Sequence, residues 1–228
     1  TGRGVIVSAE AAAKMLNMNL NGAKVVVQGF GNVGSVAAAL AEDAGAVVVG
    51  LSDVNGGIYN PKGLPVRKIL ETLVTKGKAL QDYKDAERVS NSELLELPCD
   101  VLIPAALAAQ VDKRNAGNIK AKLVVEGANG PLTPDADAIL TDKGIMVVPD
   151  ILANAGGVVV SYFEWVQDLQ NFFWEEDEVN KKLTRIMQNS FGAVANVMEQ
   201  HKTNMRTAAY IIAVKRVADA TTMRGIYP

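Results

Sequence analysis

The sequence predicts an α/β fold in which helices cover both faces of a doubly wound, mainly parallel sheet, followed by a helical C-terminal tail. Short apolar runs without polar alternation recur up to Pro149, separated by helical segments, which is the pattern of strands covered on both faces. After Pro149 the pattern changes to helical segments in succession. A chain of 228 residues, 49% of them hydrophobic and 21% charged, is large enough to bury a substantial core.

The first elements expected are a helix and then a strand–helix–strand unit. Apolar residues at helical spacing predict a helix over residues 5–16. The β-branched run 24–28 predicts a strand, and the alanine-rich segment 36–44, closed by Gly45, predicts a helix. A second strand is expected at 46–51. Because the helix between them is long enough for a crossover, the two strands should be parallel neighbours.

Three more apolar runs complete an expected sheet of five strands, at residues 101–103, 123–125 and 145–148. The segments between the strands predict helices over residues 66–74 and 134–141, and the polar stretch 76–92 is interpreted as surface. The tail predicts three helices, over residues 154–170, 175–200 and 206–221. We therefore expect a core over residues 1–149 and a tail over residues 150–228 that packs on it.

Charge and composition exclude several classes of function. Lys and Arg total 23 against 25 Asp and Glu, a balance that argues against nucleic acid as a partner. Cys99 and His201 are single residues of their kinds, so neither a disulfide framework nor a metal site is expected. No apolar run reaches the ~18 residues of a bilayer span, so no membrane partner is expected. We expect a reducing compartment, the cytoplasm, with the mitochondrion as the alternative.

A glycine-rich turn between the first predicted strand and its helix is the main functional motif. Gly29-Phe30-Gly31-Asn32-Val33-Gly34 is a complete GxGxxG, and Asp53 follows Gly34 by 19 residues at the end of the second strand. Gly29 permits a sharp turn, Gly31 lets a pyrophosphate approach the backbone, and Gly34 allows the helix to pack on the strand. The helix N-terminus then offers unpaired amides to the anion.

This pattern is typical of a Rossmann-type dinucleotide site, in which Asp53 accepts hydrogen bonds from the adenine ribose. A carboxylate there repels a 2′-phosphate, which favours NAD over NADP, the alternative cofactor. The competing interpretation is an ordinary glycine-rich turn followed by a solvated aspartate.

Several blocks of sequence are more specific than the glycine motif. They are residues 1–5 (TGRGV), 27–34 (VQGFGNVG), 102–106 (LIPAA), 126–131 (EGANGP), 149–158 (PDILANAGGV) and 161–167 (SYFEWVQ). Together they resemble the cofactor-binding domain of hexameric glutamate dehydrogenases, within the wider family that also includes leucine, phenylalanine and valine dehydrogenases. The resemblance runs essentially from end to end, and it implies that residues 1–228 form one dinucleotide-binding domain.

The resemblance also implies roles for individual residues. Phe30, Gly31, Asn32 and Val33 match the pyrophosphate turn of the family, and Asp53 matches its acidic ribose ligand. The positions that match the nicotinamide half of the cleft are Thr1, Ala106, Gln110, Asn129 and Asn154. Val158 and Ser161 match two residues that touch the substrate, Ser161 by hydrogen bonding its side-chain carboxylate.

The implied function is that of an NAD(P)-dependent glutamate dehydrogenase, which oxidatively deaminates L-glutamate to 2-oxoglutarate and ammonia and assembles as a homohexamer. Family members carry a substrate domain before the Thr-Gly-Arg-Gly block, with a lysine that activates water and an aspartate that relays protons. We expect that domain to lie outside residues 1–228, and so no catalytic residue is expected in this chain. We expect the chain to bind the cofactor without turnover.

Alternative interpretations are kept open. A leucine- or phenylalanine-type dehydrogenase would share the fold, and Ser161 favours a carboxylate over an apolar substrate side chain. A non-catalytic nucleotide-binding module or a methyltransferase-like domain would also use a glycine turn. Asn129 and Asn154 could simply form turns, and Ser161 could simply face solvent. Cys99 is interpreted as a core residue.

Overall fold

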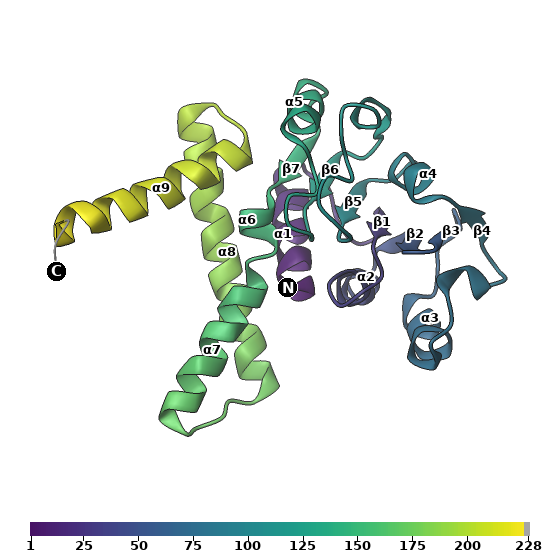
Figure 1. The fold of residues 1–228 in the computed structure, drawn as a ribbon, viewed down its shortest axis with the longest axis horizontal. Coiled ribbons are helices and arrows are strands. Elements are labelled where there is room, and N and C mark those ends of the chain that lie inside the picture. The colour runs from purple at the N-terminus through teal and green to yellow at the C-terminus, as the bar shows by residue number, and fades with distance from the viewer. Residues whose placement is uncertain (226–228) are drawn as a thin grey trace.

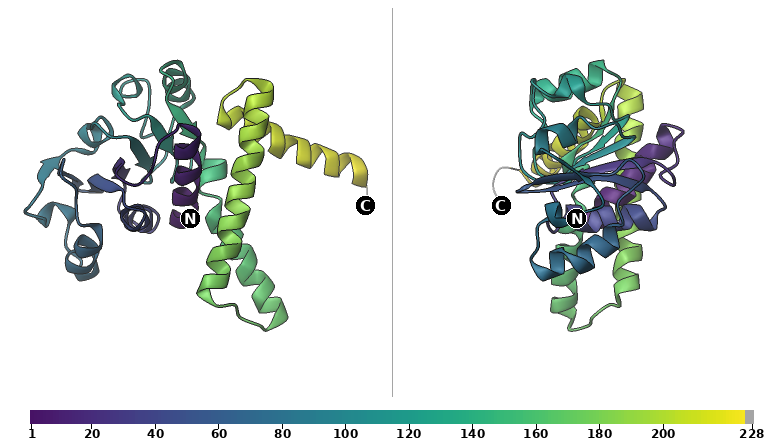
Figure 2. Two further views of the ribbon diagram at one scale, coloured as in Figure 1. Left: turned by 180° about the vertical axis from the view of Figure 1, so that it is seen from behind. Right: turned by 90° about the vertical axis from the view of Figure 1, so that its right-hand side faces the viewer.

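The computed structural model describes residues 1–225 as three layers, with helices on both faces of one sheet (Figure 1). The sheet has seven strands in the order β4-β3-β2-β1-β5-β6-β7. The strands are β1 (Lys24–Gln28), β2 (Val47–Asp53), β3 (Gly56–Tyr59), β4 (Glu87–Val89), β5 (Val101–Pro104), β6 (Leu123–Val125) and β7 (Met146–Val148). The right-hand view of Figure 2 shows the sheet edge-on between the helical layers.

The centre of the sheet is β1, which pairs in parallel with β2 on one side and β5 on the other. Val27 is in register with Leu51 of β2 and with Ile103 of β5. The strands β5, β6 and β7 continue the parallel arrangement. All five predicted strands are therefore confirmed, as is the parallel pairing of the first two.

Two short antiparallel strands at one edge of the sheet were not predicted from the sequence. Strand β3 pairs with β2, and β4 pairs with β3. Strand β3 begins with Gly56 and Gly57, which have low strand propensity, and β4 is a polar edge strand of three residues. The segment 76–92 is thus mostly exposed, as expected, but it contains this strand.

The helices divide into two layers and a tail. Their bounds are α1 (Gly2–Met15), α2 (Gly34–Asp43), α3 (Val66–Thr72), α4 (Asn91–Leu95), α5 (Pro134–Asp142), α6 (Asp150–Ala153), α7 (Gly156–Gln170), α8 (Glu176–His201) and α9 (Met205–Arg224). Single 3₁₀ turns lie at η1 (Val74–Lys76), η2 (Leu80–Asp82) and η3 (Ala116–Asn118). Helices α2 and α3 lie on one side of the sheet, and α4 and α5 on the other (Figure 1).

Alternate residues of each central strand enter different cores. Val25 and Val27 pack in the core on the α2 side, whereas Val26 packs in the core on the α5 side. All three are essentially inaccessible to solvent. Both faces of the strand are covered, which explains why these runs are apolar without alternation. Cys99, just before β5, is buried as expected; burial raises the pKa of its thiol to about 12.

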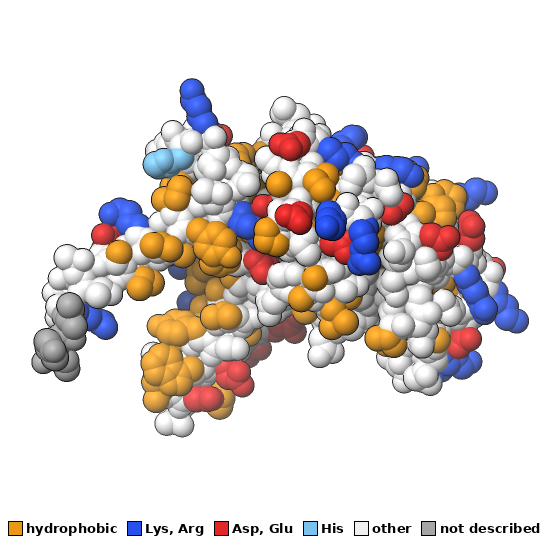
Figure 3. Space-filling model, turned by 45° about the horizontal axis from the view of Figure 1, so that its top comes forward, with side chains coloured by type: hydrophobic (Ala, Val, Ile, Leu, Met, Phe, Trp, Pro, Cys, Tyr) orange, Lys and Arg blue, Asp and Glu red, His pale blue; other side chains and the backbone are white. Residues whose placement is uncertain are grey.

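The predicted tail helices are present as α7, α8 and α9, and α6 is a further short helix before them. Helix α8 packs along α1 and buries Phe191 and Val194, whereas α9 projects beyond the sheet and carries the C-terminal end (Figures 1 and 2). Hydrophobic side chains gather on the lower limb formed by α7 (Figure 3). Among residues 1–225, no helix combines the length and the apolar character needed to cross a membrane.

Asp100 joins the amino ends of three strands. Its Oδ2 accepts the Lys24 amide at 2.9 Å, and its Oδ1 accepts the Lys122 ammonium at 3.0 Å. Partial burial works to raise the pKa of Asp100, but the Lys24 amide and the Lys122 ammonium outweigh it and hold the pKa below its usual value. The ionised carboxylate therefore stabilises the folded chain.

We expect Asp100→Asn to lower the free energy of unfolding at neutral pH by about 1 kcal/mol, measured by urea denaturation. Since the folded-state pKa is depressed, this stabilisation is present above the unfolded pKa and is lost as pH falls through the folded pKa. The gap between wild type and variant should therefore close below about pH 4. Asp85→Asn, at an exposed position, is the control. A gap that stays constant down to acidic pH would contradict this account.

Candidate functional site

The order of the strands creates a crevice at the carboxyl edge of the sheet. From β1 the chain crosses to β2 on one side, and later strands continue from β5 on the other, so the direction reverses between β1 and β5. In open α/β sheets, ligands bind in the crevice at such a point. The glycine turn follows β1, and the residues after β5, β6 and β7 meet it at the same edge.

The three motif glycines occupy distinct environments. Gly29 has a φ of +89°, and a Cβ there would lie 2.7 Å from the Ala106 Cα atom. A Cβ on Gly34 would lie 1.8 Å from the Gly29 carbonyl oxygen, so α2 packs directly on the end of β1. Nothing lies within 4 Å of a Cβ built on Gly31. Gly29 and Gly34 thus have the turn and packing environments that were expected. The space beside Gly31 is open, so a ligand could approach its backbone.

Backbone amides line the start of α2. Ser35 donates its amide to the Gly31 carbonyl at 2.9 Å, which is the first turn of this helix. The amides of Gly31, Asn32 and Val33 precede that bond, and Gly31 and Asn32 are exposed. Such amides, at the positive end of a helix dipole, suit an anionic group. Phe30 is different, because its side chain is buried in the core and only its backbone belongs to the turn.

Asp53 ends β2 beside the glycine turn. The preceding Ser52 is in register with Gln28 and accepts the Gly29 amide on its Oγ at 3.3 Å. Asp53 itself accepts the Asn55 amide on Oδ1 at 2.7 Å and the Leu80 amide on Oδ2 at 3.2 Å. These bonds fix the half-buried carboxylate, and each oxygen keeps a further lone pair for a ligand.

A cleft of about 770 Å³ extends from the glycine turn across the carboxyl edge of the sheet. Its lining residues come from the chain start, the glycine turn and the segments after β5, β6 and β7. They are Thr1, Val33, Ala105, Ala106, Leu107, Ala108, Gly127, Ala128, Asn129, Asn154, Gly157, Val158 and Ser161. The structure thus gathers seven of the predicted site residues: Thr1, Val33, Ala106, Asn129, Asn154, Val158 and Ser161. Among the described residues that line the cleft, none has a titratable side chain.

The two predicted asparagines are joined to each other. Asn154 donates its Nδ2 to Asn129 Oδ1 at 2.7 Å, linking the segments that follow β6 and β7. Gln110 is not among the residues that line the cleft; its Oε1 accepts the Nε2 of the buried Gln28 at 3.0 Å. This bond ties the segment after β5 to the end of β1.

The start of α7 forms the far side of the cleft. Val158 and Ser161 are exposed and line it. A Cβ on Gly157 would lie 2.4 Å from the Thr1 Oγ1 atom, and a Cβ on Gly4 would lie 3.1 Å from the Gly156 Cα atom. Gly156 and Gly157, at the start of α7, therefore allow α1 to approach closely, which brings Thr1 to the cleft.

A buried charge cluster behind the cleft was not predicted from the sequence. Glu126, directly after β6, is inaccessible to solvent and is paired with Arg206 of α9. Asp150, at the start of α6, donates its amide to Glu126 Oε2 at 2.6 Å. A glutamate at the end of an apolar strand was the one available signal, because its arginine partner lies 80 residues further along the chain.

The chain is similar in sequence to known glutamate dehydrogenases. The chain is 55% identical over its whole length to a glutamate dehydrogenase from Thermotoga maritima, and 48% identical over 99% of its length to an NAD-specific glutamate dehydrogenase from Staphylococcus aureus. It covers 55% and 54% of those proteins, so it spans about half the length of the curated relatives it matches.

Solved structures give the same result. The fold superposes on a hetero-hexameric glutamate dehydrogenase from Thermus thermophilus, crystallised in a leucine-bound form, with a TM-score of 0.93 and 38% identity. That match covers 100% of this chain and 53% of the other. Residues 1–225 match the family model for Glutamate/Leucine/Phenylalanine/Valine dehydrogenases, and the chain therefore belongs to that family.

Proposed function

We propose that the chain is the dinucleotide-binding domain of an NAD-dependent glutamate dehydrogenase, which deaminates L-glutamate to 2-oxoglutarate and ammonia. The observation that carries the proposal is the open backbone at Gly31: the exposed residues Gly31 and Asn32 at the start of α2 directly precede Val33, which lines the cleft. The relatives named as NAD-specific glutamate dehydrogenases support it. In the full-length protein we expect a homohexamer, and the hetero-hexameric Thermus relative supports assembly into an oligomer. We expect that protein in the cytoplasm, with the mitochondrion as the alternative.

The residues present fit a dinucleotide. The amides of residues 31–33 would hold its pyrophosphate, and the Asp53 carboxylate would accept hydrogen bonds from the adenine ribose. Thr1, Ala106 and the Asn129–Asn154 pair would border its nicotinamide end. When bound, NAD supplies a hydride acceptor. The chain's own contribution is to bind and orient that acceptor within a neutral cleft.

The far side of the cleft would receive the substrate. Ser161 offers a hydroxyl that would donate a hydrogen bond to the side-chain carboxylate of glutamate, next to the exposed Val158. A leucine- or phenylalanine-type substrate is the second candidate, because Val158 and Leu107 supply apolar surface in the same cleft.

The isolated chain should bind without turnover. Oxidative deamination needs proton transfers to and from the reacting nitrogen and water, which require a positioned acid or base. The cleft lining consists of apolar, amide and hydroxyl side chains. We propose that the acid and base come from the half of the protein that the curated relatives contain beyond this segment.

We expect NADH to bind saturably to the chain, followed by enhancement of nicotinamide fluorescence, with negligible reduction of NAD in the presence of glutamate. Absence of a saturable signal at millimolar NADH would contradict the binding site. If the chain alone oxidised glutamate at rates typical of enzymes, the proposal that the catalytic acid and base lie outside this segment would be contradicted.

Gly31→Ala tests whether the open backbone is the pyrophosphate site. The added methyl meets nothing within 4 Å in the free protein, so the urea unfolding midpoint should not change. It would occupy space that the phosphates need, so we expect NADH affinity to fall about tenfold or more. Gly117→Ala, at another glycine with open surroundings, should leave both measurements unaltered. Unchanged NADH binding in the Gly31 variant would place the phosphates elsewhere.

Asp53→Asn tests the choice of cofactor. Asparagine removes the charge and keeps an oxygen that can accept the Asn55 amide. We expect NADH binding to weaken about tenfold, since a hydrogen bond to a charged acceptor is lost, and NADPH binding to strengthen, since repulsion of the 2′-phosphate is relieved. Parallel titrations with the two reduced cofactors measure the ratio. A ratio equal to that of the wild type would remove Asp53 from the ribose site.

A further inference from the structure

We propose that Arg206 of α9 is a positioning residue for the nicotinamide end of the cleft, acting through Glu126 and Asp150. Arg206 does not line the cleft. Glu126 and Asp150 hold the segments that carry Asn129 and Asn154. This inference rests on the proposed function, because it assigns the nicotinamide to the same cleft.

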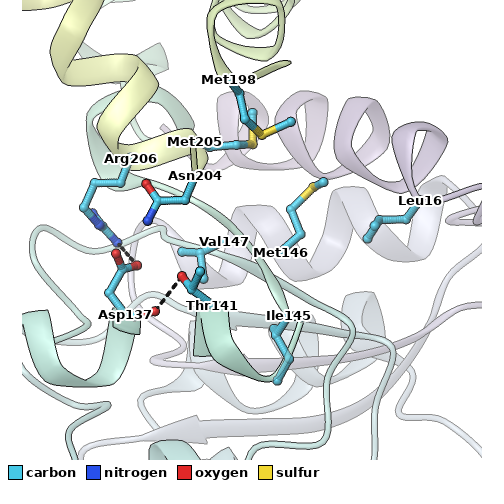
Figure 4. A pocket seen from close by; sticks show the side chains of 11 residues that line it. Leu16, Asp137, Thr141, Ile145, Met146, Val147, Met198, Asn204, Met205 and Arg206 are labelled. Carbon is cyan, nitrogen blue, oxygen red and sulfur yellow. Dashed lines mark hydrogen bonds and ion pairs between the residues drawn. The ribbon is translucent and has the colours of Figure 1, made fainter. Parts of the chain in front are cut away.

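The first step is the ion pair between Arg206 and Glu126. Its Nη2 donates to Glu126 Oε1 at 2.6 Å and its Nη1 to Oε2 at 3.1 Å, so both carboxylate oxygens are held. Arg206 Nη2 also donates to Asp137 of α5 at 3.1 Å. Figure 4 shows the Arg206 side chain extending from α9 to Asp137, beside a small pocket between the tail and the sheet. One guanidinium therefore ties α9 to α5 and to the end of β6.

The second step leads from Glu126 to the cleft. Asp150 donates its amide to Glu126 Oε2 at 2.6 Å and accepts the Gly130 amide on Oδ2 at 2.8 Å. The Arg206 Nη1 atom lies 3.5 Å from the other Asp150 oxygen. Gly130 follows Asn129 in the chain. The backbone N–H of Asn154 donates to the Asp150 backbone carbonyl at 3.0 Å. Both asparagines are thus connected to Asp150 by short paths of hydrogen bonds.

The chemistry of the cluster favours a geometric role. Burial raises the pKa of Glu126 although the guanidinium opposes that effect, and three carboxylates surround a single arginine. Buried ion pairs add little net stability compared with apolar packing of the same shape. A guanidinium held to both oxygens of a carboxylate does, however, fix the angle between them. Asn204 caps α9 by accepting the Thr207 amide at 2.8 Å, so the start of the helix that carries Arg206 is itself held in place.

The experiment compares two probes, NADH and ADP-ribose, the second of which lacks the nicotinamide. With Arg206→Met we expect NADH affinity to fall about tenfold, as for loss of about 1.4 kcal/mol, while ADP-ribose affinity stays within about twofold of the wild type. A general loss of structure would weaken both ligands alike. Arg216→Met is the matched control, because Arg216 lies exposed on the same helix.

Two further variants cover the case in which Arg206→Met folds poorly. Arg206→Lys keeps the positive charge but lacks the planar fork, so we expect a smaller loss, about threefold, again for NADH alone. Glu126→Gln combined with Arg206→Met removes both charges together and is compared with each of the two substitutions made alone. If Arg206 acts through Glu126, the double variant should lose no more NADH affinity than the larger of the two single losses.

The outcomes separate this inference from the proposed function. A wild-type chain that binds neither NADH nor ADP-ribose overturns the proposed function, and this inference with it. A wild-type chain that binds both, with folded Arg206 variants that lose the two ligands equally or lose neither, overturns this inference alone. Selective loss of NADH in the Arg206 variants, with the Arg216 variant unchanged, supports it.

Discussion

The contact of α2 with the end of β1 sets the geometry of the whole carboxyl edge of the sheet. Gly34 lies against the Gly29 carbonyl, and Gly29 lies against Ala106, with no room for a side chain at either point. These two contacts bring the amides of the helix, the turn and the segment after β5 to one place. Because the constraint is steric, it operates before any ligand binds, and it leaves the surface at Gly31 open.

At this edge of the sheet, uncharged and charged side chains occupy different places. The cleft itself is lined by apolar, amide and hydroxyl side chains, while the charged residues Glu126, Asp137, Asp150 and Arg206 lie behind it in a hydrogen-bonded cluster. The amide and hydroxyl groups of the cleft, held in place by this cluster, can orient a ligand without adding a titrating side chain to the site. This arrangement supports the proposed function, in which the chain would orient a hydride acceptor.

The tail links this edge to the rest of the molecule. Helix α8 packs on α1, whose N-cap residue Thr1 reaches the cleft, and α9 inserts Arg206 into the charge cluster. Beyond that point α9 leaves the sheet, and Val214 and Val217 are 65% and 68% exposed. Helix α9 is therefore buried only near its start, at Met205, Ala208 and Ala209, because no element of residues 1–225 covers the remainder.

Local chemistry in the sequence determined most of the fold and the outline of the site. Five strands are buried on both faces, so each appears in the sequence as an apolar run that could be recognised. The glycine motif indicated where the turn lies. The family resemblance pointed to seven residues that line the cleft. The edge strands β3 and β4 were missed because β3 begins with two glycines and β4 is a short, mostly exposed strand, so neither forms an apolar run in the sequence. Only the tertiary structure decided that Gln110 bonds to Gln28, that Gly157 accommodates Thr1, and that Arg206 meets Glu126. Each of those contacts joins residues far apart in the chain, and their energy depends on distances that exist only once the sheet and helices have packed.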